Sequence, residues 1–478
     1  MVGRETEVKE LNRLYDRNRA ELIAVYGRRR VGKTYLIDET FAGRFTFRHA
    51  GLSPEEDDSG PLLDQQLLHF YNSLRKQGMK EGCVPENWLN AFYLLEDFLE
   101  ERDDGTRQLV FLDELPWMDT PKSGFLKAFE GFWNNWGCHR KNLMVIVCGS
   151  ANSWIMDKMI NDHGGLYNRV TYEIKLLPFT LSECEEYYQE NDIRFSRYDI
   201  TQGYMIFGGI PYYMGYMNGE LSLAQNIDDM FFRKNARLSQ EFDRLFSSVF
   251  VNPEAEKKIV FLLGKRNAGY TRKEIAEKLR ISDGGGLTRY LNALIASDFV
   301  IRYVPFGFSK REEHYKLTDP FCLFYLHFLG NGKNLQNNYW QQNITSQEVV
   351  SWRGLAFENV CFSHVEEIKK ALGVSGVASQ NSAWSKRYDD ESGMQIDLLI
   401  ARNDNVINMC EIKYYSGDFR VSGDYYKTIL ERQQRLYEMV PKKTSVRSTL
   451  VTTFGLAKNE YSGAFTNVIT LDDLFCHN

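Results

Sequence analysis

The feature that most constrains this chain is an apolar run that leads directly into a glycine-rich loop and a helical pattern. Residues 21–26 read Glu-Leu-Ile-Ala-Val-Tyr, and Gly27-Arg28-Arg29-Arg30-Val31-Gly32-Lys33-Thr34 follows at once. A short apolar run of this kind is typical of a buried parallel strand. Glycine at positions 27 and 32 lets backbone N–H groups curl around a phosphate without a Cβ clash. The pattern therefore predicts a strand, a phosphate-binding loop and a helix.

The helix after this loop adds the groups that hold a nucleotide and its metal ion. Its first turn presents unpaired N–H groups and the positive end of the helix dipole to an anion. Lys33 is expected to neutralise charge on the β- and γ-phosphates, and the Thr34 hydroxyl is expected to ligate Mg²⁺. We therefore expect ATP and Mg²⁺ as cofactors, with Gly27, Gly32, Lys33 and Thr34 in the binding site.

A second apolar run, Leu109-Val110-Phe111-Leu112, ends in the carboxylates Asp113 and Glu114. Downstream of a phosphate-binding loop, this pattern predicts that Asp113 holds Mg²⁺ through water. It also predicts that Glu114 polarises the attacking water as a general base. The alternative for Glu114 is a carboxylate at the end of a strand that merely faces solvent.

Two later segments could complete the nucleotide site. The apolar residues 143–148 predict a third strand, and Ser150 or Asn152 behind it could bond to the γ-phosphate or to the attacking water. A helix N-cap is an equally good interpretation of Ser150. Arg169 precedes another β-like run and could reach a γ-phosphate within the chain or across a subunit contact. The alternative for Arg169 is a surface salt bridge.

Taken together, these motifs resemble those of the archaeal-type P-loop ATPases, a family of the AAA+/STAND branch. The resemblance covers residues 1–215. It rests on Val2-Gly3-Arg4-Glu5, the loop at 27–34, Asp113-Glu114-Leu115-Pro116-Trp117, Gly149-Ser150 and Gly208-Gly209-Ile210-Pro211-Tyr212. In that family the opening segment lies by the adenine, and the Gly-x-Pro segment lies in a small helical lid that senses the nucleotide. The resemblance therefore implies a nucleotide-sensing role for Pro211, and it matches Arg169 to an arginine of such ATPases.

The middle of the chain is predicted to form a helical lid and then a winged helix. Helical patterns around residues 183–190, 199–207 and 224–246 predict the lid and a connecting helix. A helix then begins near residue 255. Thr271 is a candidate cap for the next helix, Gly284-Gly285-Gly286 breaks the chain, and residues 287–295 resume a helix. Two strands follow at 300–304 and 313–317, and this is the element order of a winged helix.

The charge of this segment favours a nucleic-acid partner. Residues 253–318 carry 13 Lys and Arg against 8 Asp and Glu, a net charge of +5 in a chain whose net charge is −6. Thr288, Arg289 and Asn292 are expected on the outer face of the second helix of the helix–turn–helix. We therefore predict DNA contact, while docking onto protein and service as a domain hinge stay open as alternatives.

The last part of the chain combines carboxylates with a lysine in a pattern that suits phosphodiester chemistry. An amphipathic helix over 354–372 carries Glu358. A strand at 394–400 carries Asp397, and the next strand at 406–413 carries Glu411 and Lys413. Glu411 and Lys413 project from one face because they are two residues apart. Glu358, Asp397 and Glu411 could hold Mg²⁺, and Lys413 could help to deprotonate a water.

The order of these elements resembles the PD-(D/E)xK restriction-endonuclease superfamily. Glu358 would match the helical carboxylate that such folds often add, and the helix around residues 431–435 would match the one after the site, where a Gln can assist. The chain departs from the pattern because no Pro precedes Asp397. A plain salt bridge between Glu411 and Lys413, or a nuclease-shaped but inactive domain, are the alternatives.

The length of the chain indicates how many domains these assignments should fill. At about 100–200 residues per domain, 478 residues predict about three domains, with two or four as alternatives. We predict an α/β fold. Its parts are a P-loop ATPase core over 1–177, a helical lid and connector over 178–252, a winged helix over 253–330 and an α/β restriction-endonuclease-like domain over 331–478.

Composition and motif absences exclude several other classes. Hydrophobic residues make up 43% of the chain and charged residues 26%, which argues against wholesale disorder. No apolar run approaches the roughly 20 residues of a membrane span, and the N-terminus lacks a secretory pattern. We therefore expect a cytoplasmic protein without a membrane partner. The eight cysteines form no CxxC pair, so most should be buried reduced thiols, and the histidines lack zinc-binding spacing.

The sequence thus predicts an ATP-hydrolysing enzyme with DNA as its partner, and it leaves nuclease activity open. A homo-oligomer stays open, since Arg169 acting across a subunit contact would require one. The alternative is a nucleotide-controlled switch of the STAND type whose C-terminal domain binds DNA or protein without cleaving.

Overall fold

Two groups of elements make up the chain, and each is described by itself. The computed structural model describes residues 1–53, 62–160, 165–166, 168–250, 253–309, 312–330, 336–386 and 394–476. The first unit comprises Met1–Leu177 and Leu245–Val251, and the second comprises Pro178–Arg244 and Asn252–Asn478. Among the described residues, no helix is long and apolar enough to cross a membrane.

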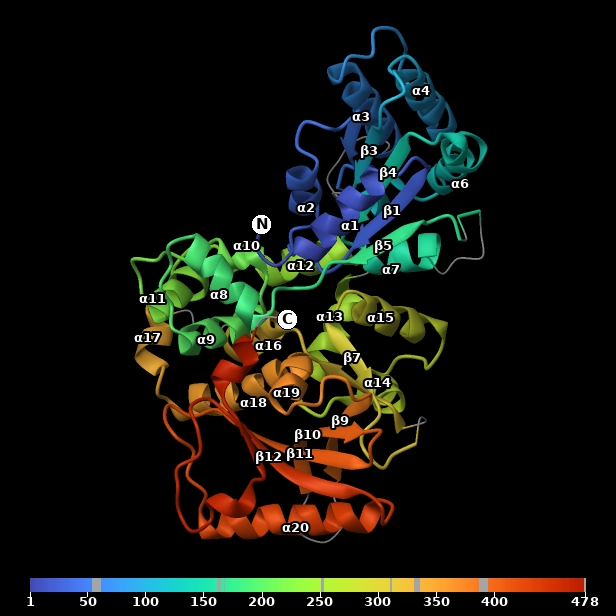
Figure 1. Cartoon of the computed structure of the whole chain (residues 1–478). Coiled ribbons are helices and arrows are strands. Elements are labelled where there is room, and N and C mark those ends of the chain that lie inside the picture. The colour runs from blue at the N-terminus through green and yellow to red at the C-terminus, as the bar shows by residue number, and fades with distance from the viewer. Residues whose placement is uncertain are drawn as a thin grey trace. The chain divides into compact units, whose positions relative to one another are not determined.

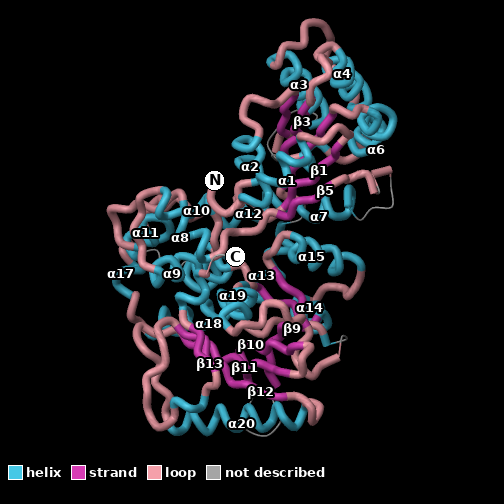
Figure 2. Tube along the Cα trace, in the orientation of Figure 1, coloured by secondary structure: helices cyan, strands magenta, loops and turns pink. Residues whose placement is uncertain are grey.

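A parallel five-stranded sheet is the centre of the first unit (Figures 1 and 2). Its order is β2-β3-β4-β1-β5. The strands are β1 (Glu21–Tyr26), β2 (Phe47–Ala50), β3 (Gln108–Asp113), β4 (Leu143–Gly149) and β5 (Tyr172–Lys175). Every residue of β1, β3 and β4 is buried, which explains their continuous apolar sequences. The strands expected at 21–26, 109–112 and 143–148 are therefore confirmed.

Helices and short helical turns cover this sheet. They are α1 (Glu5–Tyr15), α2 (Lys33–Thr40), α3 (Leu62–Lys76), α4 (Trp88–Glu100), α5 (Leu115–Met118), α6 (Phe125–Gly131), α7 (Asn152–Ile155) and the turns Phe132–Trp136, Gly137–His139 and Met156–Ile160. An aromatic cluster joins α3, α4 and α6: the ring centroids of Phe70 and Trp88 lie 5.5 Å apart, and those of Trp88 and Phe125 lie 4.9 Å apart. This packing fixes the helices against one face of the sheet.

The second unit begins with helices. These are α8 (Leu181–Glu190), α9 (Arg197–Phe207), α10 (Pro211–Met214), α11 (Leu223–Ile227), a π-helical turn at Asp228–Phe232 and the first residues of α12 (Glu241–Val249), which belongs to the first unit from Leu245 on. The helical pattern expected over 224–246 is thus interrupted between residues 233 and 240. The chain leaves the helix at Arg233, whose ψ is 153°, and Asn235 has a φ of 63°. Two such residues cannot continue an α-helix.

Residues 253–317 form three helices and a small antiparallel sheet. The elements are α13 (Pro253–Leu263), β6 (Tyr270–Thr271), α14 (Arg272–Leu279), α15 (Gly285–Ala296), β7 (Val300–Tyr303) and β8 (His314–Leu317), and the sheet order is β6-β8-β7. Thr271 caps α14 through a capping box with Glu274, as expected. The expected break at the three glycines is wrong in part, because Gly285 and Gly286 already belong to α15 and Gly284 is its N-cap.

Two short helices and a long one lead into the C-terminal part. After α16 (Pro320–Phe324), a helical turn at Tyr325–Leu329 and α17 (Tyr339–Asn343), the chain forms α18 (Gln347–Ser363) and α19 (Val365–Ala371). The single helix expected over 354–372 is therefore wrong. The helical segment starts earlier, at Gln347, and is divided into α18 and α19 at His364, whose φ of −112° and ψ of 34° are not helical. The buried His364 ring explains the break, because it bonds to Val360 O at 2.8 Å and accepts from Leu181 N–H at 3.1 Å.

A mixed five-stranded sheet follows, with the order β13-β12-β11-β10-β9. Its strands are β9 (Ser379–Lys386), β10 (Met394–Arg402), β11 (Val406–Lys413), β12 (Ser445–Thr452) and β13 (Asn467–Ile469), and a turn at Leu471–Phe475 ends the described chain. Strands β9, β10 and β11 are antiparallel neighbours, whereas β12 runs parallel to β11. The long α20 (Gly423–Met439) makes the crossover from β11 to β12, as Figure 1 shows.

The cysteines are free thiols, and Cys148, Cys184, Cys322, Cys361 and Cys410 are buried. This confirms the expectation that most of them are buried and reduced.

Candidate functional site

The predicted phosphate-binding loop lies between β1 and α2. Gly27 has a φ of 146°, and a Cβ there would lie 2.2 Å from the carbonyl oxygen of Leu176. Gly32 has a φ of 92° and immediately precedes α2. Both positions therefore require glycine. At Gly32 the reason is the backbone conformation, and at Gly27 it is the backbone conformation together with the lack of space for a Cβ. The Gly27 N–H donates to Asn152 Oδ1 at 2.8 Å, so Asn152 holds the start of the loop.

Lys33 lies inside the loop and is 5% exposed. Its ammonium donates to the carbonyl oxygens of Gly27 at 2.9 Å and Arg28 at 3.2 Å, and to Ser150 Oγ at 3.4 Å. Burial lowers the pKa of Lys33, while the negative charges of Glu114 and Asp113 act in the opposite direction. The loop carbonyls thus hold a buried cation at the place where a phosphate chain would pass.

The ends of β3 and β4 complete this site. The Thr34 hydroxyl donates to Asp113 Oδ2 at 2.8 Å. Glu114 accepts from the Ser150 hydroxyl at 2.8 Å and from the Ser150 N–H at 3.0 Å. The structure therefore brings Lys33, Thr34, Asp113, Glu114 and Ser150 together. A hydroxyl beside a carboxylate suits Mg²⁺, which usually takes one or two protein oxygens and completes its shell with phosphates and water.

Two further residues assigned to the nucleotide belong to other elements. Arg169 is exposed, in a turn before β5. Pro211 belongs to the second unit, where it occupies the first turn of α10. The preceding Gly209 has a φ of 65°, and a Cβ there would lie 2.1 Å from the Phe179 carbonyl oxygen. Because the Phe179 N–H also donates to Gly209 O at 2.8 Å, this turn is firmly held within its unit.

The second cluster of predicted residues lies on β10 and β11. The pairing of β10 with β9 shifts by one residue between Ile396 and Leu399, so Asp397 lies in a β-bulge. Bulges re-aim side chains and are frequent beside active sites. Asp397 Oδ2 accepts from the Ile412 N–H at 3.0 Å, next to Glu411 on the adjoining strand. The hairpin therefore brings Asp397 close to Glu411, as expected.

Glu411 is fully buried and already engaged. Arg432 Nη1, from α20, donates to both of its carboxylate oxygens at 2.6 Å, and the Tyr425 hydroxyl donates to Oε2 at 2.6 Å. Lys413 Nζ lies 4.0 Å from Glu411 Oε2. The residue pair Glu411 and Lys413 thus forms an ion pair, but Arg432 is the closer cation.

The helical carboxylate is also near. Glu358, on α18, accepts from Asn267 Nδ2 at 2.7 Å. Burial, and then the charge of Asp397, raises the pKa of Glu358 to about 7, while Lys316 and Lys413 act against this. Burial and the charge of Glu411 likewise raise the pKa of Asp397. Both shifts come first from burial and then from a neighbouring carboxylate.

Four residues of this cluster were missed by the sequence analysis: Asn267, Lys316, Tyr425 and Arg432. Arg432 and Tyr425 lie on the helix expected after the site, but nothing in a helical pattern says which of its side chains points to the sheet. Lys316 and Asn267 come from a segment that was assigned to a different domain. Among the described residues, no three His, Cys, Asp or Glu side chains are arranged as a ready-made metal site.

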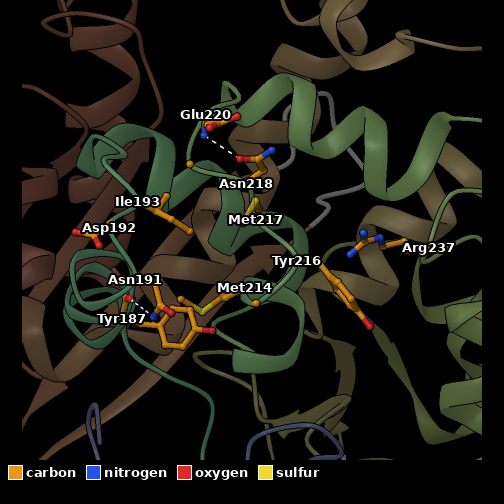
Figure 3. A pocket seen from close by; sticks show the side chains of 12 residues that line it. Tyr187, Asn191, Asp192, Ile193, Met214, Tyr216, Met217, Asn218, Glu220 and Arg237 are labelled. Atoms are coloured by element: carbon orange, nitrogen blue, oxygen red, sulfur yellow. Dashed lines mark hydrogen bonds between the residues drawn. The ribbon is translucent and has the colours of Figure 1, made fainter.

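A pocket of about 620 Å³ lies in the helical part of the second unit (Figure 3). On one side Asn191 Nδ2 donates to the Tyr187 carbonyl oxygen at 2.8 Å, and on another the Glu220 N–H donates to Asn218 Oδ1 at 3.0 Å. Its lining is Tyr187, Asn191, Asp192, Ile193, Met214, Gly215, Tyr216, Met217, Asn218, Gly219, Glu220 and Arg237. None of these is a predicted site residue.

The parallel sheet and the loop geometry define the N-terminal part of the chain as a nucleotide-binding domain of the P-loop ATPase type. Consistent with this class, residues 1–217 match the family described as "ATPase domain predominantly from Archaea". An uncharacterised protein of Methanocaldococcus jannaschii, MJECL04, is 27% identical over 409 residues, which are 84% of this chain and 84% of that protein. MJ0423, an uncharacterised ATP-binding protein of the same organism, is 56% identical over 36 residues, 8% of this chain and 61% of its own.

Solved structures with weak similarity were also found. The Walker-type ATPase PABY2304 of Pyrococcus abyssi has a TM-score of 0.43 at 17% identity and covers 69% of this chain and 96% of its own. The ORC2 protein of Aeropyrum pernix, in ADPNP–ADP complexes, has a TM-score of 0.40 at 14% identity and covers 72% of this chain and 96% of its own.

Proposed function

We propose that this protein is an ATP-hydrolysing P-loop ATPase coupled to a DNA-binding winged helix and a Mg²⁺-dependent nuclease-like domain. The observation that carries the proposal is the meeting of Glu358, Asp397, Glu411 and Lys413 around the β10–β11 hairpin, in a chain that also has a P-loop site. Two carboxylates beside a lysine are the groups that metal-assisted phosphodiester hydrolysis requires.

At the nucleotide site, the chain's own residues have distinct tasks. Lys33 would exchange its bonds to loop carbonyls for bonds to the β- and γ-phosphates. Thr34 and Asp113 would hold Mg²⁺, which neutralises phosphate charge when bound. Glu114 would leave Ser150 and accept a proton from the attacking water. Arg169 would stabilise the γ-phosphate from the same chain or, in an oligomer, from a neighbouring one, and Pro211 would belong to the nucleotide-sensing lid.

The topology of 253–317 supports the winged-helix assignment. Its order of helix, strand, two helices and two strands, with β8 between β6 and β7, is that of a winged helix. Thr288, Arg289 and Asn292 are exposed on α15. A helix of this position reads DNA in proteins of that fold, with its exposed polar side chains. We therefore assign the DNA contact to this face of α15.

The topology of the C-terminal sheet supports the nuclease-like assignment. A helix with Glu358 precedes three antiparallel strands, and α20 then crosses over to the parallel β12. Asp397 and Glu411 would hold Mg²⁺, and Glu358 is the third candidate ligand. Lys413 would orient a water for attack on the phosphorus atom and help it to lose a proton to solvent, and the ester oxygen would leave and take up a proton from solvent.

A second candidate function has one observation in its favour. Arg432 and Tyr425 already supply three hydrogen bonds to the buried Glu411 carboxylate. A carboxylate held in this way can be purely structural. The domain would then bind DNA or protein without cleaving, and the nucleotide would control that binding.

A cleavage assay distinguishes the two functions. Wild-type protein, Glu411→Gln and Lys33→Ala would be incubated with duplex, single-stranded and branched DNA and with Mg²⁺ or Mn²⁺, with and without ATP. We expect cleavage by the wild type and none by Glu411→Gln, while Lys33→Ala reports whether ATP gates the cut. The absence of cleavage on every DNA form, with ATP hydrolysis intact, would overturn the nuclease and favour the switch.

A further inference from the structure

The connection between α20 and β12 concentrates positive charge on the surface of the second unit. Residues 440–447 read Val-Pro-Lys-Lys-Thr-Ser-Val-Arg, which gives three cations and no carboxylate in a chain whose net charge is −6. Lys442, Lys443 and Arg447 are all exposed. Among the residues that the structure describes, none of the three is paired with a carboxylate. We call residues 441–447 the basic loop, and its charge is available to an anion.

Two carboxylates near the basic loop have other partners. The Ser445 N–H donates to Asn405 O at 2.9 Å, which brings the β10–β11 turn beside the loop, and Asp404 in that turn is paired with Arg402. Glu438, in the last turn of α20, accepts from a glutamine of the same helix at 3.3 Å. The negative end of the α20 dipole favours cations within that last turn only. The helix therefore does not account for cations that lie beyond it.

The backbone of the basic loop is held in a defined conformation. The Thr444 N–H donates to Pro441 O at 2.8 Å, so the two lysines lie in a hydrogen-bonded turn. The Tyr437 hydroxyl, from α20, donates to Val446 O at 3.3 Å and accepts from the Val446 N–H at 3.2 Å. A loop that is already ordered loses little backbone freedom when a ligand binds, so its cations can contribute to affinity.

The basic loop adjoins the segment to which we assign the DNA contact. Phe306 and Phe308, in the connection after β7, and Val440, at the end of α20, all pack against the core of the C-terminal sheet. A Cβ at Gly307 would lie 2.7 Å from Met439 Cε. The described part of the β7–β8 connection thus docks where the basic loop begins. Residues 253–317 and the basic loop therefore join two positively charged segments in one unit.

We propose that the basic loop is a second contact to the phosphate backbone of duplex DNA, separate from the face of α15. Lys442, Lys443 and Arg447 would each replace counterions at a phosphate. Such contacts supply affinity and position the duplex but do not read its base sequence. The inference rests on the proposed DNA-binding function, and the experiment is chosen so that the failure of one can be distinguished from the failure of the other.

The salt dependence of binding tests the proposal. Binding of a fluorescent duplex by the full-length chain would be followed by anisotropy at several salt concentrations, in EDTA and without nucleotide, so that no cleavage intervenes. The loop variant Lys442→Ala/Lys443→Ala/Arg447→Ala should lower the slope of log Kd against log salt concentration by about 2–3, because each phosphate contact accounts for about 0.9. Its Kd at physiological salt should rise roughly tenfold to hundredfold.

Two further variants make the result specific. The variant Lys80→Ala/Lys127→Ala/Lys141→Ala removes the same charge from exposed positions of the first unit and should change the slope by less than about 1. Arg289→Ala, on α15, tests the proposed function by itself. Added to the loop variant, it should raise Kd by the same factor as in the wild type, because the free energies of separate contacts add. Circular dichroism of each variant confirms that it is folded.

The other outcomes are distinguishable. An unchanged slope in the loop variant, with weaker binding by Arg289→Ala, would overturn the inference and leave the contact at α15. Equal losses in the loop variant and the first-unit variant would show that only net charge acts, which also overturns it. A wild type that binds no duplex would remove the DNA-binding function and the inference together. If the loop variant does not fold, Lys442→Ala/Lys443→Ala decides, with an expected fall in slope of about 2.

Discussion

In the nucleotide site, residues 27–34 supply most of the geometry, whereas in the carboxylate site the side chains come from several elements. Glu358 lies on α18, Asp397 on β10, Glu411 on β11, and Arg432 on α20. The first site is a backbone structure that a short sequence can encode. The second exists only after a helix, a hairpin and a crossover have packed together. The two sites should therefore respond differently to substitution, one through catalysis and the other through stability as well.

The largest effect is expected at the centre of the nucleotide site. Lys33→Ala removes the buried ammonium that would contact the phosphates and should lower kcat for ATP hydrolysis about 10³-fold. Phosphate release measures this, and Lys127→Ala, at an exposed lysine of the same unit, is the control. Turnover by Lys33→Ala within about tenfold of the wild type would contradict the assignment.

The carboxylate site should instead lose stability when its cation is removed. Arg432→Ala leaves the fully buried Glu411 with one hydrogen-bond donor, Tyr425, and with Lys413 Nζ at 4.0 Å, so the free energy of unfolding should fall by about 3 kcal/mol. Denaturant titration of the second unit's transition measures this. Lys427→Ala, on the exposed side of α20, should change it by less than about 1 kcal/mol. Equal effects of the two variants would show that the Arg432 pair is not important for folding.

Substitution of the proposed general base should separate binding from hydrolysis. Glu114→Gln keeps the shape and the bond from Ser150 but cannot take a proton, so kcat for ATP should fall about 10²-fold while the Kd for ATP stays near that of the wild type. Stopped-flow binding of a fluorescent ATP analogue and steady-state phosphate release measure the two quantities. An unchanged kcat would assign Glu114 to the alternative of a carboxylate without a catalytic task.

A buried carboxyl outside both sites provides a comparison for Glu358. Burial raises the pKa of Glu256, on α13, from its ordinary 4.5 to about 7. The folded state therefore binds a proton more tightly than the unfolded state, and the contribution of Glu256 to stability falls as the pH rises from about 4.5 to about 7. Glu256→Gln should remove this dependence and stabilise the protein at neutral pH by about 1–3 kcal/mol.

Thermal unfolding across that pH range measures the effect, with the exposed Glu277→Gln as the control. If stability changes with pH equally in Glu256→Gln and in the wild type, the Glu256 carboxyl does not titrate between about pH 4.5 and about pH 7.

The smallest effect is expected on the exposed face of α15. Arg289→Ala should weaken DNA binding by several-fold and lower the slope of log Kd against log salt concentration by about 1, because one phosphate contact is lost. Fluorescence anisotropy at several salt concentrations measures it. No change in either quantity would show that Arg289 on α15 does not contact DNA. That result would favour the alternative that this segment docks onto protein.

The two sites also differ in how much of each could be predicted from the sequence. The phosphate loop, its strand and the Thr34–Asp113 pair were predictable, because a glycine-rich loop between a strand and a helix has one geometry. The hairpin with Asp397 and Glu411 was also predictable from alternation and a turn. The bulge at Asp397, the break at His364 and the buried Lys316 were not, because each depends on residues far away in the chain.

The central claim is that one chain carries two chemically separate sites, and a crossed assay tests it most directly. ATP hydrolysis and DNA cleavage would be measured in Mg²⁺ for the wild type, Lys33→Ala and Glu411→Gln, each shown to be folded. The account predicts that Glu411→Gln hydrolyses ATP at the wild-type rate but does not cleave, and that Lys33→Ala loses ATP hydrolysis. Cleavage by Glu411→Gln at the wild-type rate would contradict it.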